Sequence, residues 1–164
     1  MQRFAAFCIC FLLQMSAVEA HDYSVGTMSI GHPWIPLERP SAASVSVYMT
    51  VENLGSEPDR LMGATSPVAQ RIELHSIHPQ GTATEMNSLE DGIDIPPGAT
   101  VPFQPGGYHL MLVAPLKTFE EKDTVPINLN FQNAGDLDVA VEVVGTVSAS
   151  ESGENGEASE RHDD

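Results

Sequence analysis

The sequence predicts an all-β fold, an antiparallel sandwich or Greek-key barrel of about nine short strands. Apolar and polar residues alternate along several segments, and this period of two is typical of half-buried strands. Turn-forming groups of proline, glycine, asparagine and aspartate separate these segments at intervals of roughly ten residues. No long segment has the 3.6-residue period of an amphipathic helix, and no internal repeat is visible.

The first two strands are predicted on either side of a proline-rich loop. The segment 27–34 is predicted as the first strand, with Pro33 ending its regular pairing because proline cannot donate a ladder hydrogen bond. The segment 35–41 should then be irregular. The second strand starts at Ala43 and has the cleanest alternation in the chain. The apolar residues expected on its buried face are Val45, Val47, Met49 and Val51.

Shorter strands are predicted through the middle of the chain. Their ranges are 60–65, 70–75, 85–87, 92–95, 100–104 and 108–113. Within 70–75, Ile72 and Leu74 should face the core and His75 the opposite side, because side chains alternate along a strand.

The last part of the domain is predicted to be a hairpin. The segment 115–123 is the best place in the chain for a helical turn, and 124–132 returns to strand alternation. The turn signal at 133–136 leads into a final strand. Its inward residues should be Leu137, Val139, Val141 and Val143.

Residues 1–20 have the composition of a secretory signal peptide. Arg3 precedes an apolar run at 4–13, which is too short to span a bilayer. Val18 and Ala20 supply the small side chains of a cleavage site, so export to the periplasm is predicted. No later apolar stretch is long enough for membrane insertion.

Both cysteines of the chain, Cys8 and Cys10, lie within this segment. Neither follows the small residues expected of a lipoprotein anchor, so no anchor is predicted. The mature chain should therefore have no disulfide and no thiolate ligand, and any site for a soft metal must use methionine and histidine.

The folded domain is predicted to span 21–147. Residues 148–164 carry six acidic side chains and no large apolar one, which predicts a disordered acidic tail. The net charge of −16 argues against binding to nucleic acid or to anionic lipid.

Four residues between 74 and 111 are candidate metal ligands. His109 and Met111 are two positions apart on a predicted strand, so imidazole and thioether should project side by side. His75 lies on the face of its strand opposite the core-facing residues. Met86 follows a run of polar residues, so it has no apolar face of its strand to join. Each could singly be an ordinary strand residue, since short motifs often arise by chance. As a set in an exported, cysteine-free domain, they favour a metal site.

Two imidazoles and two thioethers form a soft site without formal charge, which suits Cu(I) better than Zn²⁺, Ca²⁺ or Mg²⁺. Blue-copper electron transfer requires a cysteine thiolate, which the mature chain lacks. The sequence therefore predicts a protein that holds and passes on copper.

Short motifs spread over about 27–145 resemble the PCu(A)C family of periplasmic copper chaperones. They are His32-Pro33-Trp34, Asp59-Arg60-Leu61, Ser66-Pro67-Val68-Ala69, Leu74-His75, Met86, Asp91-Gly92 and the run from Pro105 to Met111. The resemblance implies a cupredoxin-like sandwich that binds Cu(I) through two histidines and two methionines. By position these are His75, Met86, His109 and Met111. It also implies delivery of copper towards cytochrome c oxidase, together with a thiol-bearing Sco-type protein or the oxidase copper subunit. The protein is expected to be a monomer.

The chain departs from the family at Ile77, where many relatives have a further methionine, and in its acidic tail. The other histidines are weaker candidates: His78 and His162 are expected to be solvated, His32 structural, and His21 a Cu(II) ligand only if it becomes the N-terminus. Copper storage or detoxification, and a metal-free β-sandwich interaction module, remain alternatives. An enzyme is not predicted, because no nucleophile arrangement or phosphate-binding loop is present.

Overall fold

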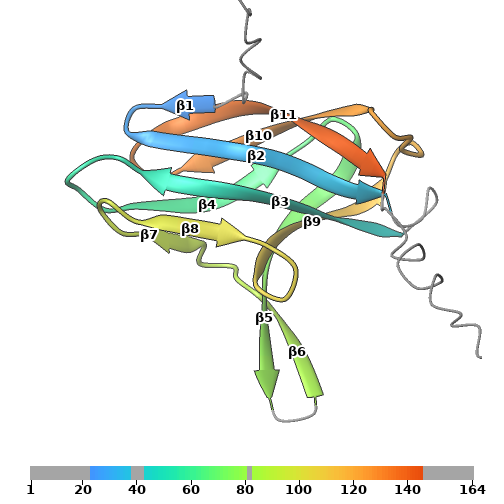
Figure 1. Cartoon of the computed structure of the whole chain (residues 1–164), viewed down its shortest axis with the longest axis horizontal. Helices are drawn as coiled ribbons and strands as arrows, with labels where there is room; N and C mark the ends of the chain where they lie inside the picture. The colour runs from blue at the N-terminus through green and yellow to red at the C-terminus, as the bar shows by residue number, and fades with distance from the viewer. Residues whose placement is uncertain (1–22, 38–42, 81–82, 146–164) are drawn as a thin grey trace, which may run out of the picture.

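A computed structural model describes residues 23–37, 43–80 and 83–145 (Figure 1). The predicted signal peptide at 1–20 and acidic tail at 148–164 lie outside the described residues, as do His21 and His162. The domain limits of 21 and 147 therefore stay predictions.

The described residues form eleven strands and no helix, which confirms the all-β fold class. The strands are β1 (Tyr23–Val25), β2 (Met28–Leu37), β3 (Ser44–Asn53), β4 (Asp59–Thr65), β5 (Ala69–Gln80), β6 (Ala83–Ser88), β7 (Ile93–Ile95), β8 (Thr100–Phe103), β9 (Tyr108–Pro115), β10 (Thr124–Phe131) and β11 (Gly135–Gly145). Because that part of the chain has no helix, it also has none long and apolar enough to cross a membrane.

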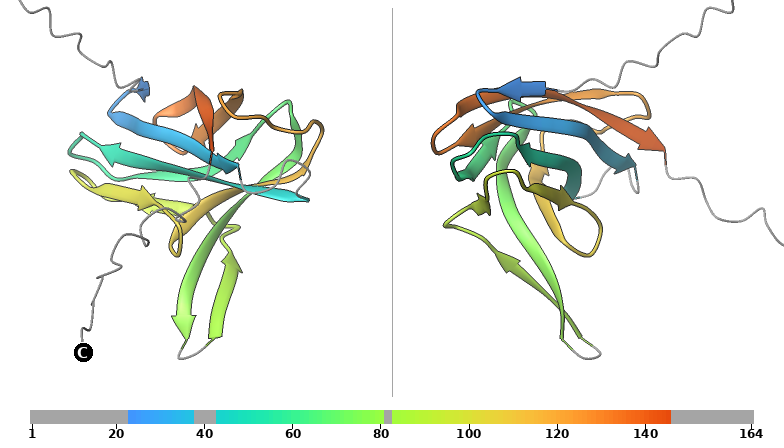
Figure 2. Two further views of the ribbon diagram at one scale, coloured as in Figure 1. Left: turned by 45° about the vertical axis from the view of Figure 1, so that its right-hand side comes forward. Right: turned by 60° about the vertical axis from the view of Figure 1, so that its left-hand side comes forward.

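All eleven strands belong to one sheet that curls into a half-barrel (Figure 2). The main path runs β6-β5-β9-β8-β3-β2-β11-β10-β4-β7, and β1 adds to β2. Most neighbours are antiparallel, but β11 pairs with β2 in parallel and β8 meets β9 in parallel at one position. The curl gives the sheet an inner face, which holds the core, and an outer face.

The core contains most of the residues that the alternation pattern predicts to face inward, whereas Val45, Ile72 and Leu137 are only partly buried and pack against it. Val47, Met49 and Val51 of β3 are buried, and the inward residues of β10 and β11 are buried at every second position. Full burial of one such aliphatic side chain stabilises the fold by roughly 1.5–3 kcal/mol. In a chain whose described part contains no cysteine, this burial has to supply most of the stability.

The prediction that β2 ends at Pro33 and that 35–41 is irregular is wrong in part, since β2 continues to Leu37. The register between β2 and β3 shifts between Gly31 and Trp34, and His32 has φ 47° there. This bulge places Pro33 where no ladder hydrogen bond is required. Pro36 lies beyond the last described pair of β2 with β3 and pairs only with β11.

The helical turn predicted within 115–123 is also wrong. The segment contains bends and one tight turn, closed by the Asp123 amide donating to the Glu120 carbonyl at 3.0 Å. Lys122 has φ 71°, which a right-handed helix cannot include. Phe119 is buried and fixes this connection to the core.

β5 is longer than the sequence predicted, because it continues past the sheet into a hairpin with β6. It pairs with β9 from Ala69 to Ser76 and with β6 from His75 to Gln80. This hairpin, 75–80 with 83–88, projects away from the half-barrel and is called the arm below (Figures 1 and 2).

Candidate metal centre

His75 and His109 face each other across neighbouring strands. They are direct partners in the antiparallel register of β5 and β9, so both side chains project to the same side of the sheet. Their ring centroids are 5.6 Å apart, edge to face. The two imidazoles, far apart in the sequence, therefore meet at one point where the arm leaves the half-barrel.

Both imidazoles are buried, with exposed fractions of 8% for His75 and 2% for His109. A row of aromatic rings continues from them across the same face. The Tyr48 ring lies 6.4 Å from that of His109, and the Trp34 ring lies 4.9 Å from that of Tyr48. This aromatic wall limits the access of water to His109.

The environment of His109 favours the neutral form of its ring. Its Nδ1 lies 3.2 Å from the Gly107 carbonyl oxygen and donates to it, which leaves the Nε2 lone pair free. The pKa of His109 is lowered, chiefly because burial disfavours the charged ring. The hydrogen bond to Gly107 raises this pKa, and the nearby His75 lowers it further. A neutral imidazole is the form that binds metals.

His75 has a different environment. Its Nε2 lies 3.2 Å from Glu73 Oε2, and its Nδ1 is buried without a hydrogen-bond partner among the described residues. Glu73 in turn accepts from Arg71 Nε at 2.6 Å. The pKa of the Glu73 carboxyl is lowered, first by the Arg71 hydrogen bond and also by His75, so the carboxylate form is favoured.

Met111 lies beside the histidines, as its spacing from His109 predicts. It is partly buried and stands opposite Glu73 on β5 and opposite Ser46 on β3. Because alternate residues of a strand share a face, its thioether is on the same side of the sheet as the His109 ring.

Met86 is the outermost of the four candidates. It pairs with Ile77 in the arm, and the next position on its face, Ser88, pairs with His75. Met86 therefore lies two cross-strand pairs farther along the arm than His75, as a diagonal neighbour on the same face. Its exposed fraction is 49%, so its thioether can be reached from solvent.

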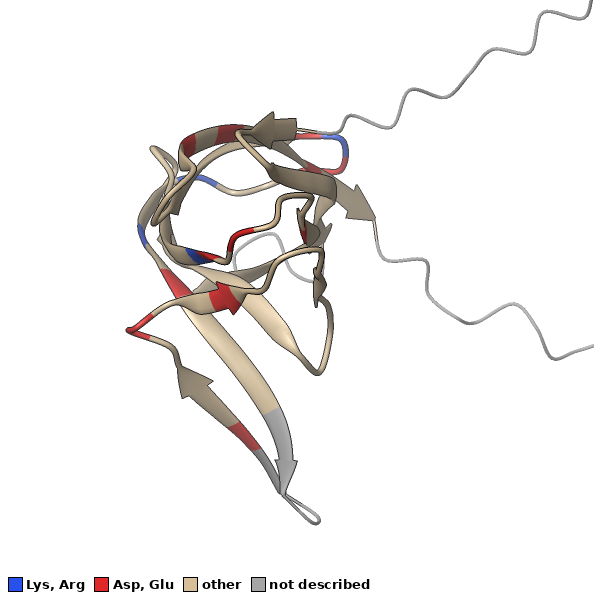
Figure 3. Ribbon diagram, turned by 90° about the vertical axis from the view of Figure 1, so that its left-hand side faces the viewer, with Lys and Arg blue, Asp and Glu red and all other residues tan. Residues whose placement is uncertain are grey.

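Negative charge dominates the surface around this end of the molecule. Figure 3 shows acidic residues on β6, on the turn after it and on β7. They are Glu85, Glu90, Asp91 and Asp94, all exposed. Asp94 is paired with Arg60, but the net charge of this surface is negative and should attract cations at long range.

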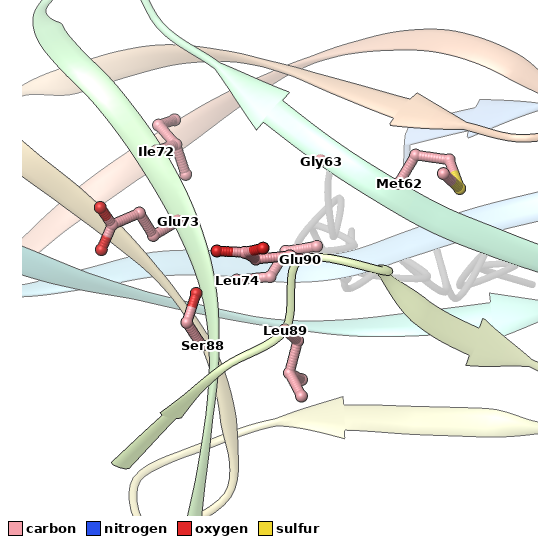
Figure 4. A pocket seen from close by; sticks show the side chains of 8 residues that line it. All are labelled: Met62, Gly63, Ile72, Glu73, Leu74, Ser88, Leu89 and Glu90. Carbon is pink, nitrogen blue, oxygen red and sulfur yellow. The ribbon is translucent and has the colours of Figure 1, made fainter.

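A hollow of about 330 Å³ lies next to the candidate site but does not contain it (Figure 4). It opens between β4 and β5 and is lined by Met62, Gly63, Ile72, Glu73, Leu74, Ser88, Leu89 and Glu90. None of the four candidate ligands lines it. In the described part of the chain, no three histidine, cysteine, aspartate or glutamate side chains cluster in a way that could hold a metal ion.

Known structures and sequences resemble this chain over most of the described fold. The copper-bound PCuAC domain from PmoF2 is 30% identical, with a TM-score of 0.65, and the match covers 77% of this chain and 99% of that one. The chain belongs to the PCuAC family. It also matches the family described as "Putative lipoprotein LpqE-like" over residues 28–143.

Two further relatives extend this comparison of the PCuAC fold. The solution structure of CuI-DR1885 from Deinococcus radiodurans is 28% identical, with a TM-score of 0.58, and covers 76% of this chain and 81% of that one. A protein of Leifsonia xyli named "Putative lipoprotein Lxx21020" is 28% identical over 116 residues, 71% of this chain and 69% of its own length. Lipoproteins are exported to the cell envelope, so the family name is that of envelope-associated proteins.

Three residues beside the candidate site were not anticipated from the sequence. The alternation of the strand that starts at Ala43 puts Tyr48 on the face opposite Val47 and Met49, and a lone tyrosine among serine and threonine there could have signalled a second buried surface. Glu73 and Arg71 share the face of His75 at alternate positions, and that spacing was the available signal. Among the weaker candidates, His32 is exposed at the β2 bulge, and His78 pairs with Glu85 in the arm.

Proposed function

We propose that this protein is an exported copper chaperone that holds Cu(I) between His75, Met86, His109 and Met111 and passes it to a partner. The observation that carries the proposal is the meeting of two imidazoles in one β5–β9 register pair. The similarity to a copper-bound PCuAC domain and to CuI-DR1885 supports the choice of metal. Thioether and imidazole donors match Cu(I), which prefers soft ligands.

The gradient of burial across the four donors supports delivery over storage. The imidazoles are buried, Met111 is partly buried and Met86 is half exposed. An incoming thiolate can therefore displace the Met86 thioether first, and the remaining donors hold the ion until the second bond forms. A stepwise exchange of this kind never releases free Cu(I). A storage site would hold its copper ion more securely if all of its donors were buried.

The proposed destination is assembly of cytochrome c oxidase, through a thiol-bearing Sco-type protein or the oxidase copper subunit. A cysteine pair binds Cu(I) more strongly than neutral thioethers do, which gives transfer a direction. Oxidase activity at low copper in a deletion strain tests delivery. Unchanged oxidase activity combined with copper sensitivity would favour storage instead.

The ligand set is tested by a double variant. Replacing His109 with Gln and Met111 with Leu removes two donors while keeping similar volumes, so the fold should survive and tight Cu(I) binding should be lost. Anaerobic competition with a Cu(I)-selective chelator measures the binding, and circular dichroism measures the fold. Wild-type affinity in a folded double variant would refute the assignment.

Met62→Leu is the matched control for this test. Met62 is also an exposed methionine, at 40%, but it lies on β4 and lines the hollow next to the site. Its replacement should leave the Cu(I) affinity unchanged. X-ray absorption of the copper-loaded wild type would then count sulfur and nitrogen neighbours directly.

A further inference from the structure

Three residues of β5 form a line of polar contacts that ends at a candidate ligand. Arg71, Glu73 and His75 occupy alternate positions and therefore project from the same face of the strand. Arg71 Nε lies 2.6 Å from Glu73 Oε1, and His75 Nε2 lies 3.2 Å from Glu73 Oε2. The line runs inward, since the exposed fraction of the side chains falls from 59% for Arg71 to 32% for Glu73 and 10% for His75.

These contacts determine which nitrogen of His75 is free. A carboxylate can only accept hydrogen bonds, so the nitrogen that faces Glu73 has to carry the hydrogen. A neutral imidazole has one N–H, and Nδ1 is then left with its lone pair. That Nδ1 is buried and has no hydrogen-bond partner among the described residues. Buried nitrogen atoms are rarely left unpaired, so this one points to a ligand that is bound from outside the chain.

We propose that Glu73 is a positioning residue that holds the His75 ring with Nε2–H on its carboxylate and Nδ1 towards the copper ion. This inference rests on the proposed function, because it takes His75 as a Cu(I) ligand. Both carboxylate oxygens are already engaged, one by Arg71 and one by His75, so Glu73 acts through His75 and is not itself a ligand. Histidines that bind metals are commonly oriented in this way by a carboxylate on the other nitrogen.

The two histidines then present opposite nitrogen atoms. His109 donates from Nδ1 to the Gly107 carbonyl, which leaves its Nε2 for the metal. His75 donates from Nε2 to Glu73, which leaves its Nδ1. A backbone carbonyl fixes one ring and a side-chain carboxylate fixes the other. The His75 half of the site should therefore respond to substitution at position 73, and the His109 half should not.

The test compares wild-type protein with Glu73→Ala, Glu73→Gln and Glu90→Gln. Glu90 lines the same hollow as Glu73, so Glu90→Gln removes an equal charge nearby and serves as the control. Long-range ¹H–¹⁵N NMR of the histidine rings, with and without Cu(I), reports which nitrogen carries the hydrogen and which binds the metal. Anaerobic chelator competition reports the Cu(I) affinity of the same four proteins.

In wild-type protein, Cu(I) should shift Nδ1 of His75 and Nε2 of His109, and the His75 Nε2–H signal should be visible and downfield before copper is added. Glu73→Ala should lose that signal to exchange with water and bind Cu(I) about 10–100-fold more weakly. Glu73→Gln keeps an acceptor oxygen, so it should retain part of the His75 Nε2–H signal and part of the Cu(I) affinity. Glu90→Gln should resemble wild type.

Two results would overturn the inference without touching the proposed function. One is tight Cu(I) binding by wild-type protein through Nε2 of His75. The other is a Glu73→Ala variant that binds as tightly as wild type, even if it is thermally less stable, since a purely structural Glu73 would give that pattern. Failure of wild-type protein to bind Cu(I) at all would instead refute the proposed function.

Discussion

Replacing Met86 with leucine separates the fold of the arm from its proposed chemistry. Full burial of a side chain of this size is worth roughly 1.5–3 kcal/mol, and Met86 keeps 49% of its surface exposed, so about half of that value is at stake. Leucine has a similar volume and retains most of this contribution. The free energy of unfolding should therefore change by less than about 0.5 kcal/mol.

The effect on copper should be much larger, because leucine has no donor atom. With one of four proposed donors removed, Cu(I) affinity should fall at least about tenfold, which corresponds to ~1.4 kcal/mol of binding free energy. Anaerobic chelator competition measures the affinity, and X-ray absorption should count one sulfur neighbour fewer than in wild-type protein. Met62→Leu, an exposed methionine outside the site, is expected to match wild type in both measurements.

A Met86→Leu variant with wild-type affinity and an unchanged sulfur count would refute the reasoning. It would mean that the arm carries Met86 for another purpose and that the site has three donors from this chain. A large loss of stability would contradict a different step, the inference that Met86 contributes little to packing.

Two other predictions concern acid and the buried carboxylate of Asp59. The lowered pKa of His109 means that its folded ring takes up a proton less readily than a free imidazole, so protonation of His109 should compete with Cu(I) only below about pH 6.5; a His109 ring that NMR shows protonated above about pH 7 in the copper-free protein would contradict this. Asp59 is buried and accepts backbone hydrogen bonds from Arg60, Asn133 and Ala134 at 2.7–2.9 Å. Asp59→Ala should therefore cost about 2 kcal/mol or more in a urea unfolding titration, whereas Asp59→Asn should cost less because it keeps one acceptor; equal costs would mean that these bonds do not stabilise the turn.

Local pattern was sufficient to predict the strands whose two faces differ in polarity. The inward residues of β3, β10 and β11 alternate with polar neighbours, so both the strands and their buried faces could be predicted. Elements set by non-local pairing were harder. β2 continues past Pro33 and Pro36 only because the bulge at His32 and the parallel partner β11 accommodate both prolines. No neighbouring residue in the sequence reveals that partner.

The same distinction holds for the candidate site. The common face of His109 and Met111 follows from strand geometry alone. The meeting of His75 with His109 depends on the β5–β9 register, which is fixed by pairing between Ala69–Ser76 of β5 and the whole of β9. The buried environment of the rings, with Tyr48 beside His109 and Glu73 beside His75, depends on how the sheet curls and packs. Spacing could suggest the donors but not their burial or orientation.

His75 occupies the junction at which β5 changes partners. The pairing with β9 ends at Ser76, and the pairing with β6 begins at His75, so His75 and Ser76 belong to both the half-barrel and the arm. A metal ion bound by His109 on one side of the junction and by Met86 on the other would add a cross-link between the half-barrel and the arm. These two parts are also joined through β5, through the chain after β6 and through the Ile77 N–H, which donates to the Gly107 carbonyl at 3.2 Å. Hydrogen exchange of the arm amides would then report occupancy, because opening the arm would require breaking a metal bond. A partner that grips the arm could in turn loosen the ion mechanically, which would make docking and release one event.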